Sequence, residues 1–197
     1  QPALAEFVST VNIARSYLSR RHPFFGRLLL YCEVVATDRT RDVAVRTDSV
    51  IFVNPLWFTR SLDTYERAGS LAFASLYLAL TCSERGARKP ALPWAVATST
   101  AIASLVDRCG LTLPMSLRKL LQEAAALGWL ELSDEEIYRG LVRGGGRPAM
   151  MSTMGEGWGL HARQGHIDGA GSHDCWQPDR RSIAGHKRRR RAPDDQG

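Results

Sequence analysis

Histidine is missing from most of this chain. The 197-residue sequence contains five histidines, and none of them lies between residues 23 and 160. The four cysteines are far apart and form no C-x-x-C pair, which argues against a zinc ribbon and a dense disulfide framework. Residues 23–160 therefore cannot supply the histidines of a metal or nucleophile site. The scattered cysteines favour a reducing, cytoplasmic setting.

The chain also lacks an apolar run long enough to cross a membrane. Its two uncharged stretches, residues 68–83 and 90–106, are shorter than the roughly 20 apolar residues that a membrane span needs, and both contain Ser and Thr. The first 21 residues have no continuous apolar core of the kind that a secretory signal carries. We therefore expect buried core helices, a cytoplasmic protein and no membrane partner.

What the chain does contain is helical periodicity with a small β-rich region. Apolar residues at spacings of three and four predict a helix over residues 3–21, which His22-Pro23 ends. The period of residues 23–35 is ambiguous and fits a short helix that continues into a strand. Residues 43–46 and 50–53 are rich in β-branched side chains and predict a hairpin with a turn at 47–49.

A central buried helix should follow this hairpin, because sixteen consecutive residues from Ala68 to Ser83 carry no charge. We predict Ser61 as its N-cap and an end near Ser83. Three further helices are expected over residues 94–109, over 116–130 with Ser116 as cap, and from Ser133, whose S-x-x-E pattern is typical of a capping box. The predicted fold class is α+β, mainly helical, with a small β-hairpin or sheet.

The periodic pattern ends near Leu141, and residues from Gly144 onward are rich in Gly and His without period. We predict a folded domain over residues 1–143 and a disordered, flexible linker and basic tail over 144–197. The tail contains four candidate metal ligands whose spacing matches no compact zinc finger: His161, His166, His173 and Cys175. It also contains a basic run that could bind nucleic acid through phosphates or could be a solvated tail: Lys187, Arg188, Arg189, Arg190 and Arg191.

Three segments carry a family resemblance: HPFFGRLLL, DVAVRTDSVIFVNPLWF and DEEIYRGL. Over about residues 3–142 they resemble the N-terminal metallopeptidase domain of bacterial proteins that continue into a von Willebrand factor A-like domain. The resemblance implies a zincin-like core in which a helix carries His-Glu-x-x-His. Two histidines four residues apart hold zinc on one face of such a helix, and the glutamate acts as general base. A MoxR-type ATPase or a von Willebrand factor A-like protein is the partner that the resemblance implies.

The positions that match this motif carry other residues. The first histidine falls on Phe73, the glutamate on Ala74 and the second histidine on Tyr77, while a further histidine falls near Cys82 and an acid near Ser99. Phenylalanine and alanine cannot bind a metal, so the resemblance implies a degenerate peptidase without zinc that acts as a protein-binding or assembly module. Without the resemblance, the same residues are interpreted as ordinary core side chains of an ordinary buried helix.

Two other hypotheses remain open at this point. The first is a metal-dependent hydrolase with a rearranged site that draws ligands from His22, Glu84 and the four tail residues named above. The second is a nucleic-acid-binding accessory protein that acts through its basic run.

Overall fold

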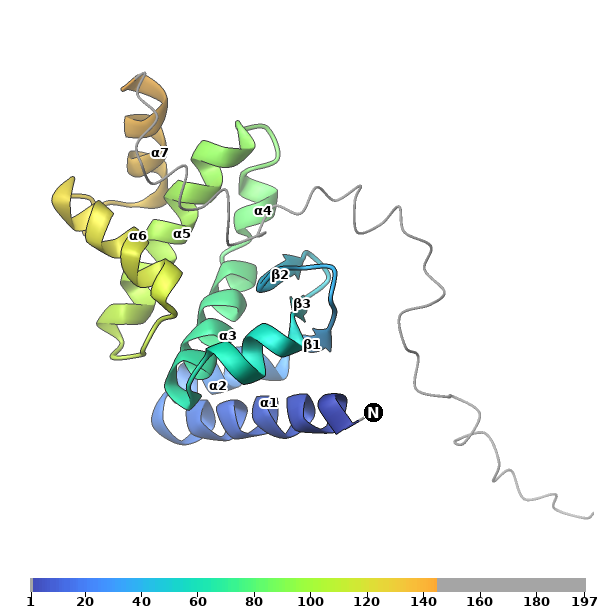
Figure 1. The fold of residues 1–197 in the computed structure, drawn as a ribbon. Helices are drawn as coiled ribbons and strands as arrows, with labels where there is room; N and C mark the ends of the chain where they lie inside the picture. The colour runs from blue at the N-terminus through green and yellow to red at the C-terminus, as the bar shows by residue number, and fades with distance from the viewer. Residues whose placement is uncertain (1, 145–197) are drawn as a thin grey trace, which may run out of the picture.

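A computed structural model describes residues 2–144 of the chain, and Figure 1 shows their arrangement. The predicted tail after Gly144, with its candidate metal ligands and its basic run, lies outside the described residues. The predicted boundary between a domain and a tail therefore stays a prediction. No helix within residues 2–144 is both long enough and apolar enough to span a membrane.

Two antiparallel neighbours begin the fold, α1 (Pro2–Arg21) and α2 (Pro23–Leu30). His22-Pro23 separates them as the sequence predicts, because the residue before a proline is displaced from helical geometry. They pack closely at Gly26, where an added Cβ would lie 2.7 Å from the Cα of Ser19. The segment of ambiguous period is thus a helix followed by a strand, as expected.

Three short strands form one sheet, β1 (Glu33–Ala36), β2 (Val43–Arg46) and β3 (Val50–Val53), in the order β1-β3-β2. The predicted hairpin is confirmed, because β2 and β3 pair antiparallel across the 47–49 turn. Ser49 adopts φ 68° at the end of that turn. β1 pairs parallel to β3, which local sequence patterns do not predict.

The central helix α3 (Thr64–Ala79) follows a π-helical segment η1 (Trp57–Ser61). The prediction of Ser61 as N-cap is wrong, because Asp63 accepts hydrogen bonds from the N–H groups of Tyr65 and Glu66 at 2.8 Å, and Glu66 completes the capping box. The helix also ends earlier than expected. Thr81 adopts a left-handed conformation at φ 50°, and a separate short helix α4 (Cys82–Arg85) begins after it.

The remaining helices are α5 (Ala91–Arg108), α6 (Met115–Ala126) and α7 (Asp134–Arg143). The prediction of Ser116 as a cap is wrong, because α6 already begins at Met115 after Pro114 and ends before Gly128, whose φ is 70°. The capping box at Ser133 is confirmed, since its side chain accepts from the Glu136 N–H and Glu136 returns to the Ser133 N–H.

Helix α3 occupies the middle of the described body. It packs against α1, α2 and β2 on one side and against α5 on the other (Figure 1). Every residue from Ala68 to Tyr77 is buried, so this helix is surrounded rather than amphipathic. The described part is mainly helical with one small sheet, which confirms the predicted α+β class.

Candidate functional site on helix α3

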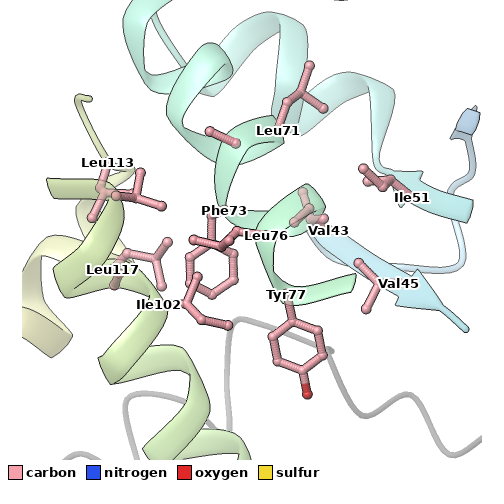
Figure 2. Packing of buried hydrophobic residues seen from close by; sticks show 14 of the residues in the cluster. Val43, Val45, Ile51, Leu71, Phe73, Leu76, Tyr77, Ile102, Leu113 and Leu117 are labelled. Atoms are coloured by element: carbon pink, nitrogen blue, oxygen red, sulfur yellow. The ribbon is translucent and has the colours of Figure 1, made fainter. Parts of the chain in front are cut away.

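The two aromatic residues at the predicted histidine positions fill the interior beside α3. Phe73 and Tyr77 lie four residues apart on one face, with stacked rings whose centroids are 6.5 Å apart at 30°. Both side chains, and that of Ala74 between them, are 0% exposed. Figure 2 shows the Phe73 ring directed towards Ile102 on α5 and Leu117 on α6. The face that would carry metal ligands is therefore part of the hydrophobic core.

Among Phe73, Ala74 and Tyr77, only Tyr77 has a side-chain oxygen that could act as a metal ligand. Burial and, to a smaller extent, the neighbouring Cys82 thiol raise the pKa of Tyr77 to about 12, against the lowering effect of hydrogen bonds with Thr98 and Ser83. The phenol therefore stays protonated at neutral pH, and its hydrogen bonds join α3 to α4 and α5. A protonated, hydrogen-bonded phenol does not supply the anionic oxygen that zinc prefers.

The two remaining positions are Cys82 at the start of α4, which lies close enough to Tyr77 to affect its pKa, and Ser99 on α5, and both are 0% exposed. Burial raises the pKa of the Cys82 thiol to about 12, with Asp134 raising it and Arg85 lowering it. Zinc binds the thiolate form, which this environment disfavours. The Ser99 hydroxyl is buried on α5 without a hydrogen-bond partner among the described residues. The five predicted positions thus hold two rings, a methyl group, a neutral thiol and a neutral hydroxyl, and this donor set does not fit a zinc ion.

Other ligand combinations are also missing from residues 2–144, where no group of three His, Cys, Asp or Glu side chains is placed to hold a metal ion. His22 contacts the Tyr17 ring between α1 and α2, with centroids 5.7 Å apart. Glu84 lies in α4. The four tail candidates for a rearranged site lie outside the described part of the chain, so that hypothesis is not tested by this geometry.

A polar cluster that the sequence did not predict lies where α4, α5 and α7 meet. It surrounds the buried Trp94, whose indole N–H donates to the Cys82 carbonyl at 2.7 Å. The Nζ of Lys89 is 3.5 Å from the centroid of the Trp94 ring and also pairs with Glu135. Tyr138 meets the same indole edge-on, with centroids 5.7 Å apart. Trp94 is therefore enclosed by cationic and aromatic groups.

A bidentate ion pair completes this cluster. Both terminal nitrogens of Arg85 lie 2.8 Å from carboxylate oxygens of Asp134, and the guanidinium carbon is 5.3 Å from the Trp94 ring centroid. The pairing raises the pKa of Arg85 above its ordinary value. The partners are 49 residues apart, so the only sequence signal was opposite charge in two separate polar segments. The cluster joins α7 to the rest of the body.

A buried carboxyl group, that of Asp42, lies immediately before β2. Asp42 is 5% exposed, and burial raises its pKa to about 7 against the lowering effects of a hydrogen bond from the Val43 N–H and the charge of Arg41. The backbone carbonyl of Asp42 accepts from the Asn54 N–H at 2.8 Å, which ties the two ends of the hairpin together. This carboxyl group is a structural feature of the hairpin in the described part.

The order of these elements, a hairpin that ends in Asn54-Pro55 and then a buried central helix, is the arrangement that the resemblance implied. A family model described as the putative metallopeptidase domain matches residues 6–193. The chain belongs to this family. The match extends beyond the 3–142 range of the motifs and includes most of the predicted tail of this metallopeptidase-like chain. No curated protein and no solved structure matches the chain.

Proposed function

We propose that this metallopeptidase-like chain is catalytically degenerate and acts as a protein-binding or assembly module. One observation carries the proposal: the helix positions that would hold zinc and the general base are occupied by Phe73, Ala74 and Tyr77, all 0% exposed and packed in the core. Water, metal and substrate would have to share the space that these side chains fill.

The rest of the framework is retained without the chemistry. The hairpin is tied at Asp42 and Asn54, and α3 begins with a complete capping box at Asp63. Tyr77 joins α3 to α4 and α5 by hydrogen bonds of its hydroxyl. A folded domain without reactive groups can still act by binding other proteins through its surface. The partners we propose are a MoxR-type ATPase or a von Willebrand factor A-like protein.

Metal content tests the catalytic part of the proposal. We expect the purified full chain to contain zinc well below one ion per chain and to leave an unstructured protein substrate such as casein uncut. Zinc near one equivalent that disappears in a His166→Ala, His173→Ala double variant, together with casein cleavage, would contradict the proposal and establish the rearranged hydrolase instead.

Co-elution tests the binding part. The full chain mixed with a purified MoxR-type ATPase, and separately with a von Willebrand factor A-like protein, should form a complex with one of them on size-exclusion chromatography. A mixture with an unrelated ATPase is the control. Separate elution of all components would contradict the choice of partner and leave the loss of zinc chemistry as a distinct result.

The second candidate function is nucleic-acid binding, which the five consecutive basic residues 187–191 favour. Replacing these five residues with serine in the full chain should abolish retardation of DNA if the run neutralises phosphates. The binding of the parent should weaken steeply as salt is raised. Equal retardation by both proteins, or none by the parent, would contradict this alternative.

A further inference from the structure

The two edges of the small sheet differ in how they are covered. At the β2 edge, the Val43 N–H donates to the Asp42 carboxylate at 2.8 Å, and the side chains of β2 up to Val45 are buried. At the β1 edge, Glu33 is exposed and the other three residues are half-buried. Figure 1 shows β1 on the side of the sheet away from the C-terminal helices. β1 is therefore the more accessible edge.

The hydrogen bonds between β1 and β3 show which backbone groups face outward. The Glu33 N–H donates to the carbonyl of Ser49, the residue before β3, at 3.0 Å, and the Thr37 N–H donates to the carbonyl of Val53 in β3 at 2.9 Å. Partners alternate along a strand, so Val34 and Ala36 direct their N–H and C=O groups away from β3. Neither residue hydrogen-bonds to another described residue outside the sheet. Among residues 2–144, the two donors and two acceptors on this edge therefore have no partner.

This edge carries no lysine, no proline and no bulge. Natural edge strands are guarded by lysine, proline or a bulge, because an open edge pairs readily with another strand. The sequence of β1 is Glu-Val-Val-Ala, with its single charge at the first residue. Leu30 and Tyr31, which immediately precede the strand region, are 80% and 81% exposed. Exposed apolar side chains beside an open edge are typical of an interaction surface.

We propose that β1 pairs antiparallel with β1 of a second copy of this chain. A two-fold axis at Val35 places Val34 of each copy opposite Ala36 of the other. These are the residues with outward backbone groups, so each such pair exchanges two N–H to C=O hydrogen bonds. The two Val35 side chains then meet at the axis as a closely spaced pair of β-branched residues.

The charges of β1 favour pairing with a second copy in this register, because its single charged residue does not meet its own copy. Glu33 forms no ion pair with another described residue, and the axis at Val35 places it opposite Thr37 rather than opposite the other Glu33. Such an interface is closed, because it joins the two sheets and covers both β1 edges. The β1 edge would then be the surface through which the chain assembles, and this inference rests on the proposed assembly role.

Sedimentation velocity of the full chain over a wide range of concentration tests the pairing. We expect a reversible monomer–dimer equilibrium. Val34→Pro removes one outward N–H and leaves the ladder to β3 intact, since proline is tolerated where the N–H faces solvent. It should raise the dissociation constant of the dimer at least about tenfold. Val34→Thr, which keeps the N–H and the β-branched shape, should dimerise as the parent does.

Val35→Lys provides a test without any change to the backbone, because it brings two like charges together at the axis. It should give a monomer whose melting curve resembles that of the parent, with Val35→Thr as its control. A parent that is monomeric at every concentration, or a dimer that Val35→Lys leaves intact, would overturn the pairing. Either outcome leaves the loss of zinc chemistry standing, whereas stoichiometric zinc would contradict that loss and leave the pairing standing.

Discussion

Tyr77 offers the sharpest test of whether the α3 face proposed to correspond to the metal site is part of the core. Its ring is 0% exposed and stacks on Phe73 at 6.5 Å, and its hydroxyl hydrogen-bonds with Thr98 and Ser83. Substitutions can remove these interactions one kind at a time. Tyr77→Phe removes only the hydroxyl, Tyr77→Ala removes the ring as well, and Tyr77→Asp replaces both with a carboxylate.

The expected losses in the free energy of unfolding rise in that order. Two hydrogen bonds at a net ~0.5–1.5 kcal/mol each give about 1–3 kcal/mol for Tyr77→Phe. Loss of a buried aromatic ring costs about 3–5 kcal/mol, and loss of its stacking on Phe73 adds about 0.5–1.5 kcal/mol for Tyr77→Ala. Tyr77→Asp buries an unpaired charge in addition. Its total approaches the ~5–15 kcal/mol that stabilise a whole domain, so we expect no cooperative folding at neutral pH.

Urea denaturation of the full chain, followed by far-ultraviolet circular dichroism, measures these differences. Tyr65→Phe is the matched control, because Tyr65 is 54% exposed and its variant should lie within about 0.5 kcal/mol of the parent. If Tyr77→Ala cost less than about 1 kcal/mol, Tyr77 would stand in an open groove, and the argument that the ligand face is filled would fail.

The other predictions address the hairpin, the helix packing, the motif positions on α3 and α5, and the tail. Stability should fall as pH rises from about 4 to about 7, because the native state holds the Asp42 proton more tightly than the unfolded chain. Asp42→Asn should therefore raise stability at pH 8 by on the order of 2–4 kcal/mol in urea denaturation, whereas an equal response of parent and variant to pH would refute this. Gly69→Ala should prevent stable folding, because its Cβ would lie 2.0 Å from the Thr112 carbonyl oxygen; a melting temperature close to that of the parent would show that α3 is not held against this loop. A variant with the motif residues restored carries Phe73→His, Ala74→Glu, Tyr77→His and Ser99→Asp. Its melting temperature should be lower than that of the parent in chelator and should rise again when zinc is added. A loss that zinc cannot reverse would contradict the alignment at α3. Truncation after Gly144 should leave cooperative melting, and loss of cooperativity would show that residues 145–197 are structural.

Local patterns predicted those elements whose signals lie within a few residues. The β-branched runs indicated the β2–β3 pair, and the S-x-x-E pattern indicated the capping box of α7. Local patterns did not show which of two neighbouring residues with similar capping ability begins a helix. Ser61 and Asp63 are both good caps, and only the structure shows that Ser61 belongs to η1 while Asp63 begins α3. The end of α3 depends on the left-handed Thr81, a conformation that its residue type does not favour.

The sequence by itself determined which chemistry the central helix can offer. A side chain without a donor atom cannot bind zinc in any fold, so the identities of Phe73 and Ala74 were enough to decide that point, and the gap in histidines from residue 23 to 160 supported it. Only the tertiary structure decided how the Tyr77 side chain is held, because its stacking, its hydrogen bonds to other helices and its raised pKa depend on which distant segments pack around it. The parallel pairing of β1 with β3 and the enclosure of Trp94 by Lys89 likewise join segments through space, which no local periodicity records.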